Sequence, residues 1–180
     1  MSSDINGNDK QSKFNIGLAI AILSLTAMLF VAFTMDAYTT TWWNNWENVQ
    51  ADSMYKFLFS SLSVSWFVFF AVLVLVSIAD ITLIILHLID YSKGNAYKTV
   101  KPYFSKQVFL TGAIAVAVLF LATQIDALVF YNTPYINDYA ARDKIVSIKT
   151  MPGFYLSAFT IIALSITKIV FACFIKNKKV

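Results

Sequence analysis

Charged residues are scarce in this chain of 180 residues, where they make up only 13% of the sequence. A soluble domain of this size normally carries about 25% charged residues. Apolar residues make up 58%, and the mean hydropathy is +0.66. This balance predicts a chain that lies in a lipid bilayer. The net charge of +4 is small, and we expect no nucleic acid among the partners.

Cysteine and histidine are almost absent, with one residue of each, Cys173 and His87. A single cysteine allows no intramolecular disulfide and no cysteine-rich metal site, and a single histidine excludes a multi-histidine metal centre built by this chain alone. The sequence also has no internal repeat, no Gly-rich phosphate loop and no HExxH motif. We therefore expect no cofactor in this chain and no enzymatic activity from it by itself.

Four long apolar runs dominate the sequence, and a membrane-spanning helix needs about 20 such residues. We predict an all-α integral membrane protein with four transmembrane helices in one domain, a bundle over residues 14–175. The expected helices cover about residues 14–35, 57–89, 107–131 and 152–175. Residues 1–13 are predicted to be a disordered polar tail, and residues 176–180 a basic tail. The first run is longer than a signal-peptide core and ends in Met-Asp, which favours a retained helix.

Lysine and arginine are distributed unevenly between the segments that connect these helices. The N-terminal tail, the loop between helices two and three and the C-terminal tail hold nine basic residues, whereas the segments at 36–56 and 132–150 hold four. Cytoplasmic segments carry the excess of positive charge. We therefore expect both termini to be cytoplasmic, with residues 36–56 and 132–150 facing outward, in a multi-pass protein of the cell membrane.

Aromatic residues gather in "TMDAYTTTWWNNWENVQ", residues 34–50, between the first two runs. Tryptophan and tyrosine concentrate at membrane–water interfaces, where the ring lies among headgroups and the polar atom stays hydrated. The same residues also dominate the contacts that hold protein partners together. The sequence leaves both interpretations open, a membrane belt or a partner interface, for the same set of residues: Tyr38, Trp42, Trp43, Trp46 and Tyr55.

A few ionisable residues lie inside or beside the predicted helices, where such groups are costly unless they are paired or hydrated. Asp126 is expected near the outer surface and Asp80 near the inner surface, so the two do not form a proton relay through the bilayer. Lys168 lies in the fourth helix. It can extend toward the cytoplasmic surface, or pair with Asp80 if helices two and four touch.

A further pattern places Asp80, His87 and Asp90 at positions i, i+7 and i+10, on one stripe of a helix. This stripe resembles half of a metal or proton site. A simpler interpretation is a hydrated face of a helix that continues into the cytosol, which would carry such residues anyway. Three ligands on one helix do not close around a metal without ligands from elsewhere.

The order of these features resembles the C-type membrane subunit of the copper membrane monooxygenases, which oxidise ammonia or methane. "MDAYTTTWWNNWENV" is similar to the segment after that family's first span, "KTVKPYFSKQ" to its basic loop, and "RDKIVSIKTMPGFYLS" to its stretch before the last span. The family holds copper with an aspartate and two histidines. Asp143 matches the aspartate, but no histidine follows it. The resemblance implies an accessory subunit in which Asp143 approaches copper only if partners supply the other ligands.

Three hypotheses follow for function. The first is a non-catalytic structural subunit of a multisubunit membrane complex, with other integral membrane subunits and the lipid bilayer as partners. The resemblance implies that this complex is an archaeal-type ammonia monooxygenase. The second is a small ion or proton transporter component that uses Asp80, Asp126 and Lys168. The third is a claudin-like junction tetraspan, which the short segment at 36–56 and its lack of cysteine disfavour.

Overall fold

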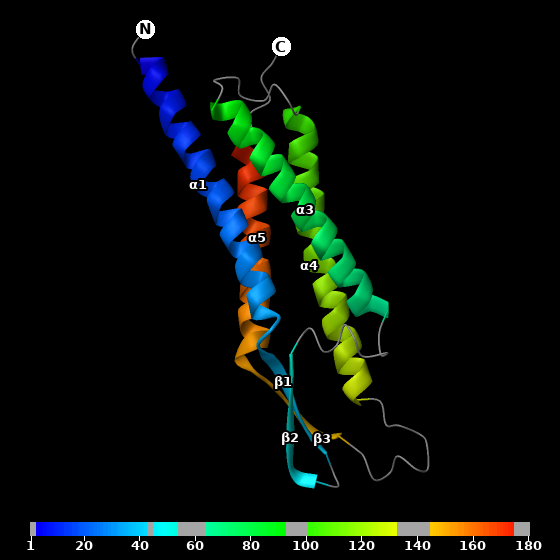
Figure 1. Cartoon of the computed structure of the whole chain (residues 1–180). Coiled ribbons are helices and arrows are strands. Elements are labelled where there is room, and N and C mark those ends of the chain that lie inside the picture. The colour runs from blue at the N-terminus through cyan, green and yellow to red at the C-terminus, as the bar shows by residue number, and fades with distance from the viewer. Residues whose placement is uncertain (1–2, 43–44, 54–63, 93–100, 133–144, 175–180) are drawn as a thin grey trace. The chain divides into compact units, whose positions relative to one another are not determined.

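The computed structural model describes residues 3–42, 45–53, 64–92, 101–132 and 145–174, which form four helices and three strands (Figure 1). The helices are α1 (Ser3–Ala32), α3 (Val64–Ser92), α4 (Pro102–Asn132) and α5 (Pro152–Phe174). The strands are β1 (Asp36–Trp42), β2 (Asn45–Ser53) and β3 (Ile145–Thr150).

All four helices are long and apolar enough to cross a membrane, as the sequence predicted. The apolar segments are Asn15–Ala32, Val64–Asp90, Pro102–Ile125 and Pro152–Phe174, and their mean hydropathies run from 2.0 to 2.8. The helices that carry these segments have 23 to 31 residues, long enough to reach across the hydrocarbon core of a bilayer, about 30 Å thick. The cytoplasmic location of both termini stays a prediction.

The helix boundaries differ in part from the predicted ones. Helices α4 and α5 begin at Pro102 and Pro152, where the fixed φ of proline suits the first helical position and its missing N–H costs nothing. Helix α1 begins at Ser3, so the structure has helix where the sequence predicted a disordered tail. Once an apolar segment has nucleated a helix, each added residue forms one more hydrogen bond, so the helix extends into polar sequence. Residues 57–63 and 175–180 lie outside the described residues.

Strands β1, β2 and β3 form an antiparallel sheet in the order β2-β1-β3, which the structure adds to the predicted helices. In the register, Thr40 of β1 lies opposite Gln50 of β2 and Ile148 of β3. The sequence offered a signal, because the run Thr39–Thr41 is β-branched and favours a strand. The interpretation of residues 36–56 as a short aromatic connection did not use this signal. The pairing of β1 with β3, more than 100 residues away, has no local signal in the sequence.

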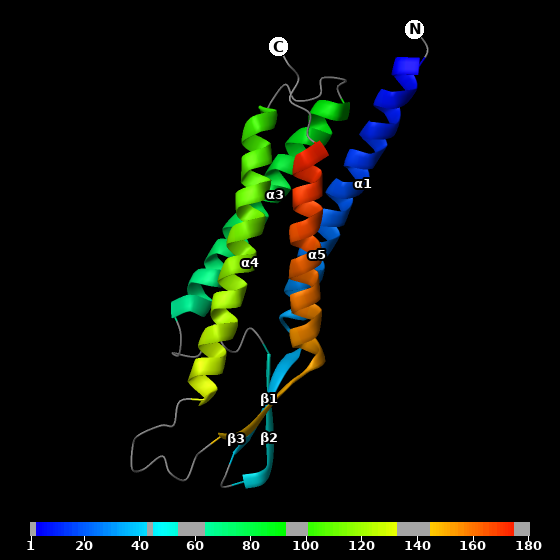
Figure 2. The same cartoon turned by 180° about the vertical axis from the view of Figure 1, so that it is seen from behind.

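The junction between the sheet and helix α5 is closely packed around Gly153. Strand β1 follows α1 and β3 leads into α5 (Figures 1 and 2). The N–H of Met151 donates a hydrogen bond of 2.8 Å to the carbonyl of Ala37. A Cβ at Gly153 would lie 2.6 Å from the backbone oxygen of Asp36 and 2.8 Å from that of Met35. This junction therefore requires glycine at position 153.

The chain divides into two compact units, and each long helix contributes residues to both. The first unit contains Met1–Ala27, Val72–Val116 and Ile162–Val180, and the second contains Met28–Ala71 and Ala117–Ile161. The sheet belongs to the second unit. There, the ring of Phe69 packs against Phe33 at 6.0 Å, Phe120 at 5.9 Å and Trp66 at 6.5 Å between centroids. Rings from the turn after α1, from α3 and from α4 thus pack together in the second unit.

Candidate functional site

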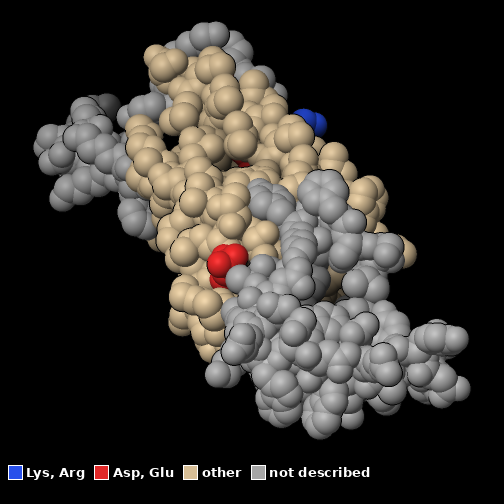
Figure 3. Space-filling model, turned by 60° about the horizontal axis from the view of Figure 1, so that its bottom comes forward, with Lys and Arg blue, Asp and Glu red and all other residues tan. Residues whose placement is uncertain are grey.

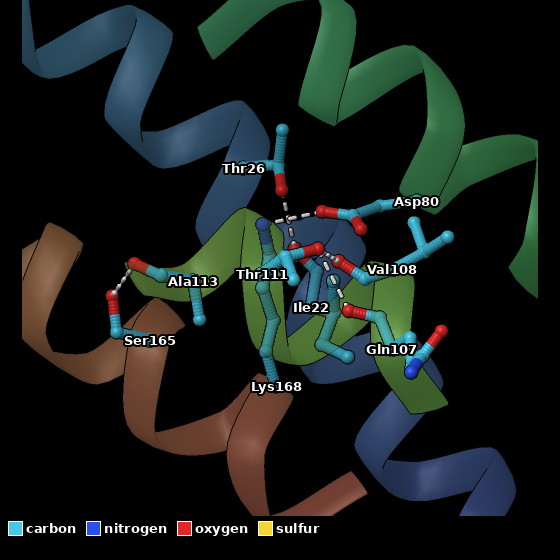
Figure 4. A network of polar contacts seen from close by, with 9 residues as sticks. All are labelled: Ile22, Thr26, Asp80, Gln107, Val108, Thr111, Ala113, Ser165 and Lys168. Carbon is cyan, nitrogen blue, oxygen red and sulfur yellow. Dashed lines mark hydrogen bonds and ion pairs between the residues drawn. The ribbon is translucent and has the colours of Figure 1, made fainter. Parts of the chain in front are cut away.

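An ion pair between Asp80 of α3 and Lys168 of α5 lies in the first unit (Figure 4). Both residues fall within apolar segments long enough to span a membrane. Each residue is 1% exposed, although lysine and aspartate are almost never fully buried unless paired. The pair predicted as one alternative from the sequence therefore forms, and Lys168 points to Asp80 instead of extending toward the end of its helix.

The environment of the pair makes each charge depend on the other. Apart from Lys168, the carboxylate of Asp80 meets no hydrogen-bond donor within the described residues. Burying one unpaired charge is far more costly than burying a matched pair. The two opposite charges thus neutralise each other and hold α3 and α5 together in the first unit. No other described hydrogen-bond donor stabilises the carboxylate of Asp80.

The hydroxyl groups near this pair bond mostly within their own helices. Thr26 of α1 donates to the carbonyl of Ile22 at 2.8 Å, and Thr111 of α4 donates to that of Gln107 at 2.7 Å (Figure 4). Such bonding to the preceding turn satisfies a hydroxyl inside an apolar helix. Ser165 of α5 instead reaches across to the carbonyl of Ala113 in α4, at 3.5 Å. The hydroxyl groups near the pair therefore donate to backbone carbonyls.

His87 occupies a second polar contact in the first unit, two helical turns from Asp80 along α3. Its Nε2 atom lies 3.0 Å from Oγ of Ser105 in α4, and its ring packs edge-on against Phe171 of α5 at 6.5 Å between centroids. Asp90 interacts with His87 electrostatically and is 4% exposed. The sequence did not indicate Ser105, which lies in the first turn of α4. No sequence pattern connects this serine with a histidine 18 residues earlier.

The predicted stripe of Asp80, His87 and Asp90 does not form one site, because Asp80 pairs with Lys168 while Asp90 interacts with His87. Asp80 binds Lys168 and His87 contacts Ser105, and the side chains of Leu83 and Ile84 are buried on the turn between them. In the part of the chain that the structure describes, no group of three or more histidine, cysteine or acidic residues could hold a metal ion.

The remaining predicted residues are placed only by their backbone. Tyr38 and Trp42 lie in β1, and Trp46 lies in β2, so three of the five aromatic residues belong to paired strands. Asp126 lies in α4. Trp43, Tyr55 and Asp143 are outside the described residues. The choice between a membrane belt and a partner interface therefore remains open for the aromatic residues.

Comparison with protein-family models, with curated proteins and with solved structures gives no match to this chain. The resemblance to a monooxygenase subunit consequently rests on the sequence segments alone. The structure adds four apolar helices, a three-stranded sheet and a buried ion pair.

Proposed function

We propose that this protein is a multi-pass integral membrane protein and acts as a non-catalytic accessory subunit of a multisubunit membrane complex. Large apolar side chains point outward on all four helices, with Val31, Phe67, Leu121 and Phe159 each more than 60% exposed. The described surface in Figure 3 is almost entirely uncharged. Such a surface requires lipid or the apolar surface of another subunit.

The observation that carries the structural role is the mutual neutralisation of Asp80 and Lys168. An ionisable residue inside a membrane helix generally marks a transport path or a reaction site. Here the two residues bind each other and are 1% exposed, so neither presents a charge to a substrate or an ion. Their arrangement favours a role in holding helices together over a role in chemistry.

The identity of the complex is proposed from the sequence resemblance, which indicates a copper membrane monooxygenase. In that case most copper ligands would come from partner subunits, because the described residues include no group of three or more possible metal ligands. Asp143 would contribute one ligand only if partners supply the others. No reaction step is assigned to this chain.

The test is to solubilise native membranes gently, separate complexes on a native gel and identify by mass spectrometry what migrates with the chain. We expect integral membrane subunits, and oxidoreductase subunits among them if the resemblance holds. Two double variants locate the contact: Phe159→Ala with Ile162→Ala on α5, and Val118→Ala with Leu121→Ala on α4. All four side chains are more than 50% exposed, so the fold should tolerate their loss. A stable monomer in mild extracts would contradict the proposal.

Transport of ions or protons is the second candidate, because Asp80 and Lys168 lie inside candidate membrane spans, where ionisable residues generally mark transport paths. The apolar residues Leu83 and Ile84 count against it, since both are buried between Asp80 and the His87 contact. The test measures proton or cation flux in liposomes that contain the full chain. Flux that persists when Asp80, Asp126 and Lys168 are all neutralised would remove the basis of this candidate.

A further inference from the structure

Helix α5 is the least apolar of the four candidate spans, and it carries Lys168. Its mean hydropathy is 2.0, compared with 2.8 for the span of α3 that carries Asp80. Lysine is among the residues that most oppose insertion of a helix into a bilayer. The two partners of the ion pair therefore lie in helices of unequal apolar character.

The side chain of Lys168 does not extend to the membrane surface, which would lower the cost of its charge in the bilayer. It is six residues before the end of α5 at Phe174, about 9 Å along the helix, within the range where a lysine stem can point toward the interface. The side chain is instead buried and bound to Asp80. The charge of Lys168 is thus neutralised by α3, inside the first unit.

We propose that Asp80 is a positioning residue for membrane insertion, and that α5 crosses the membrane because α3 supplies a carboxylate for Lys168. The inference rests on the proposed function, since it requires the four helices to span a membrane. The dependence is one-sided. With their charged residues counted, the span of α3 has a mean hydropathy of 2.8 and that of α5 a mean hydropathy of 2.0, so an unmatched charge should oppose insertion of α5 more than insertion of α3. Through this ion pair, the insertion of α5 depends on α3.

The protein contains its own reporter for this dependence. Cys173 is the only cysteine of the chain and lies one residue before the end of α5, at the end of its candidate span. If α5 crosses the membrane, Cys173 lies on the side opposite to β3. If α5 fails to cross, Cys173 stays on the same side as β3. Labelling with a membrane-impermeant maleimide therefore reads the position of α5 directly.

The experiment synthesises the full chain into sealed vesicles in a cell-free system, which avoids degradation of misfolded variants. Labelling of Cys173 from outside is divided by total labelling in detergent, and Cys173→Ser gives the background. The wild type should label from one side. Asp80→Asn should raise the share labelled from the other side about 10- to 100-fold. Lys168→Met, and Asp80→Asn combined with Lys168→Met, should both label as the wild type does.

Two results would overturn the inference while leaving the proposed function intact. One is an unchanged labelling side in Asp80→Asn, and the other is a double variant that keeps the defect of Asp80→Asn, since Asp80 would then act independently of Lys168. A wild-type chain that sodium carbonate extracts from the vesicles would be a different result. It would overturn the proposed membrane protein, and this inference with it.

Discussion

The contacts inside the first compact unit differ in kind from those inside the second. In the first unit, Asp80 and Lys168 join α3 and α5 through opposite charges, and His87 meets Ser105 of α4. In the second unit, Phe69 packs among aromatic rings, and a sheet joins the end of α1 to the start of α5. A charged side chain inside an apolar region needs a partner of opposite charge, whereas the packing of aromatic rings depends on their shape and volume. The first unit should therefore be sensitive to charge and the second to size.

The largest effect is expected from breaking the ion pair on one side. Asp80→Asn or Lys168→Met leaves a buried charge unmatched and should lower the free energy of unfolding by about 3–5 kcal/mol. Asp80→Asn with Lys168→Met removes both charges and should recover most of the stability lost in either single variant. Unfolding in mixed micelles, followed by circular dichroism during titration with a denaturing detergent, measures these changes. Single effects that add in the double variant would show that the pair contributes nothing.

Phe69 provides the corresponding test of the second unit. This side chain is 2% exposed and contacts three aromatic rings, so Phe69→Ala should cost about 3–4 kcal/mol, and Phe69→Leu clearly less. Phe159→Ala is the matched control, because Phe159 is 69% exposed and should matter little to the same unfolding measurement. Equal losses at Phe69 and Phe159 would mean that ring packing does not hold this unit.

Gly153→Ala should cost about 1–3 kcal/mol, because the new methyl group meets backbone oxygens that cannot rotate away. Gly17→Ala is the control, since Gly17 has open space at its Cβ position and alanine favours a helix. The two thermal midpoints in the same detergent should move in opposite directions. A neutral Gly153→Ala would indicate that β1 and α5 do not approach as closely as the structure shows.

The smallest effect is expected at the contact between His87 and Ser105. A single hydrogen bond between membrane helices is worth about 0.6 kcal/mol, so His87→Gln and Ser105→Ala should each change stability slightly. A double-mutant cycle measures the coupling between the two residues. Coupling as large as that of the ion pair would remove the distinction between charged and neutral polar contacts in the first unit.

The sequence by itself determined the four apolar helices, because a helix in lipid satisfies its own backbone and needs only a long apolar run. It also indicated that Asp80 and Lys168 required an explanation, since charges are rare in such runs. Local patterns fixed the start of α5 at Pro152, where the predicted and observed boundaries coincide.

The tertiary structure alone decided which distant residues meet. The sheet needs β3 to reach β1 across more than 100 residues, and no local pattern states that pairing. Likewise, the spacing of Asp80, His87 and Asp90 indicated a shared stripe, but the helices opposite each residue set its partner. Lys168 of α5 faces Asp80, and Ser105 of α4 faces His87. A helical pattern specifies a face, and only the packing of other helices on that face specifies what it binds.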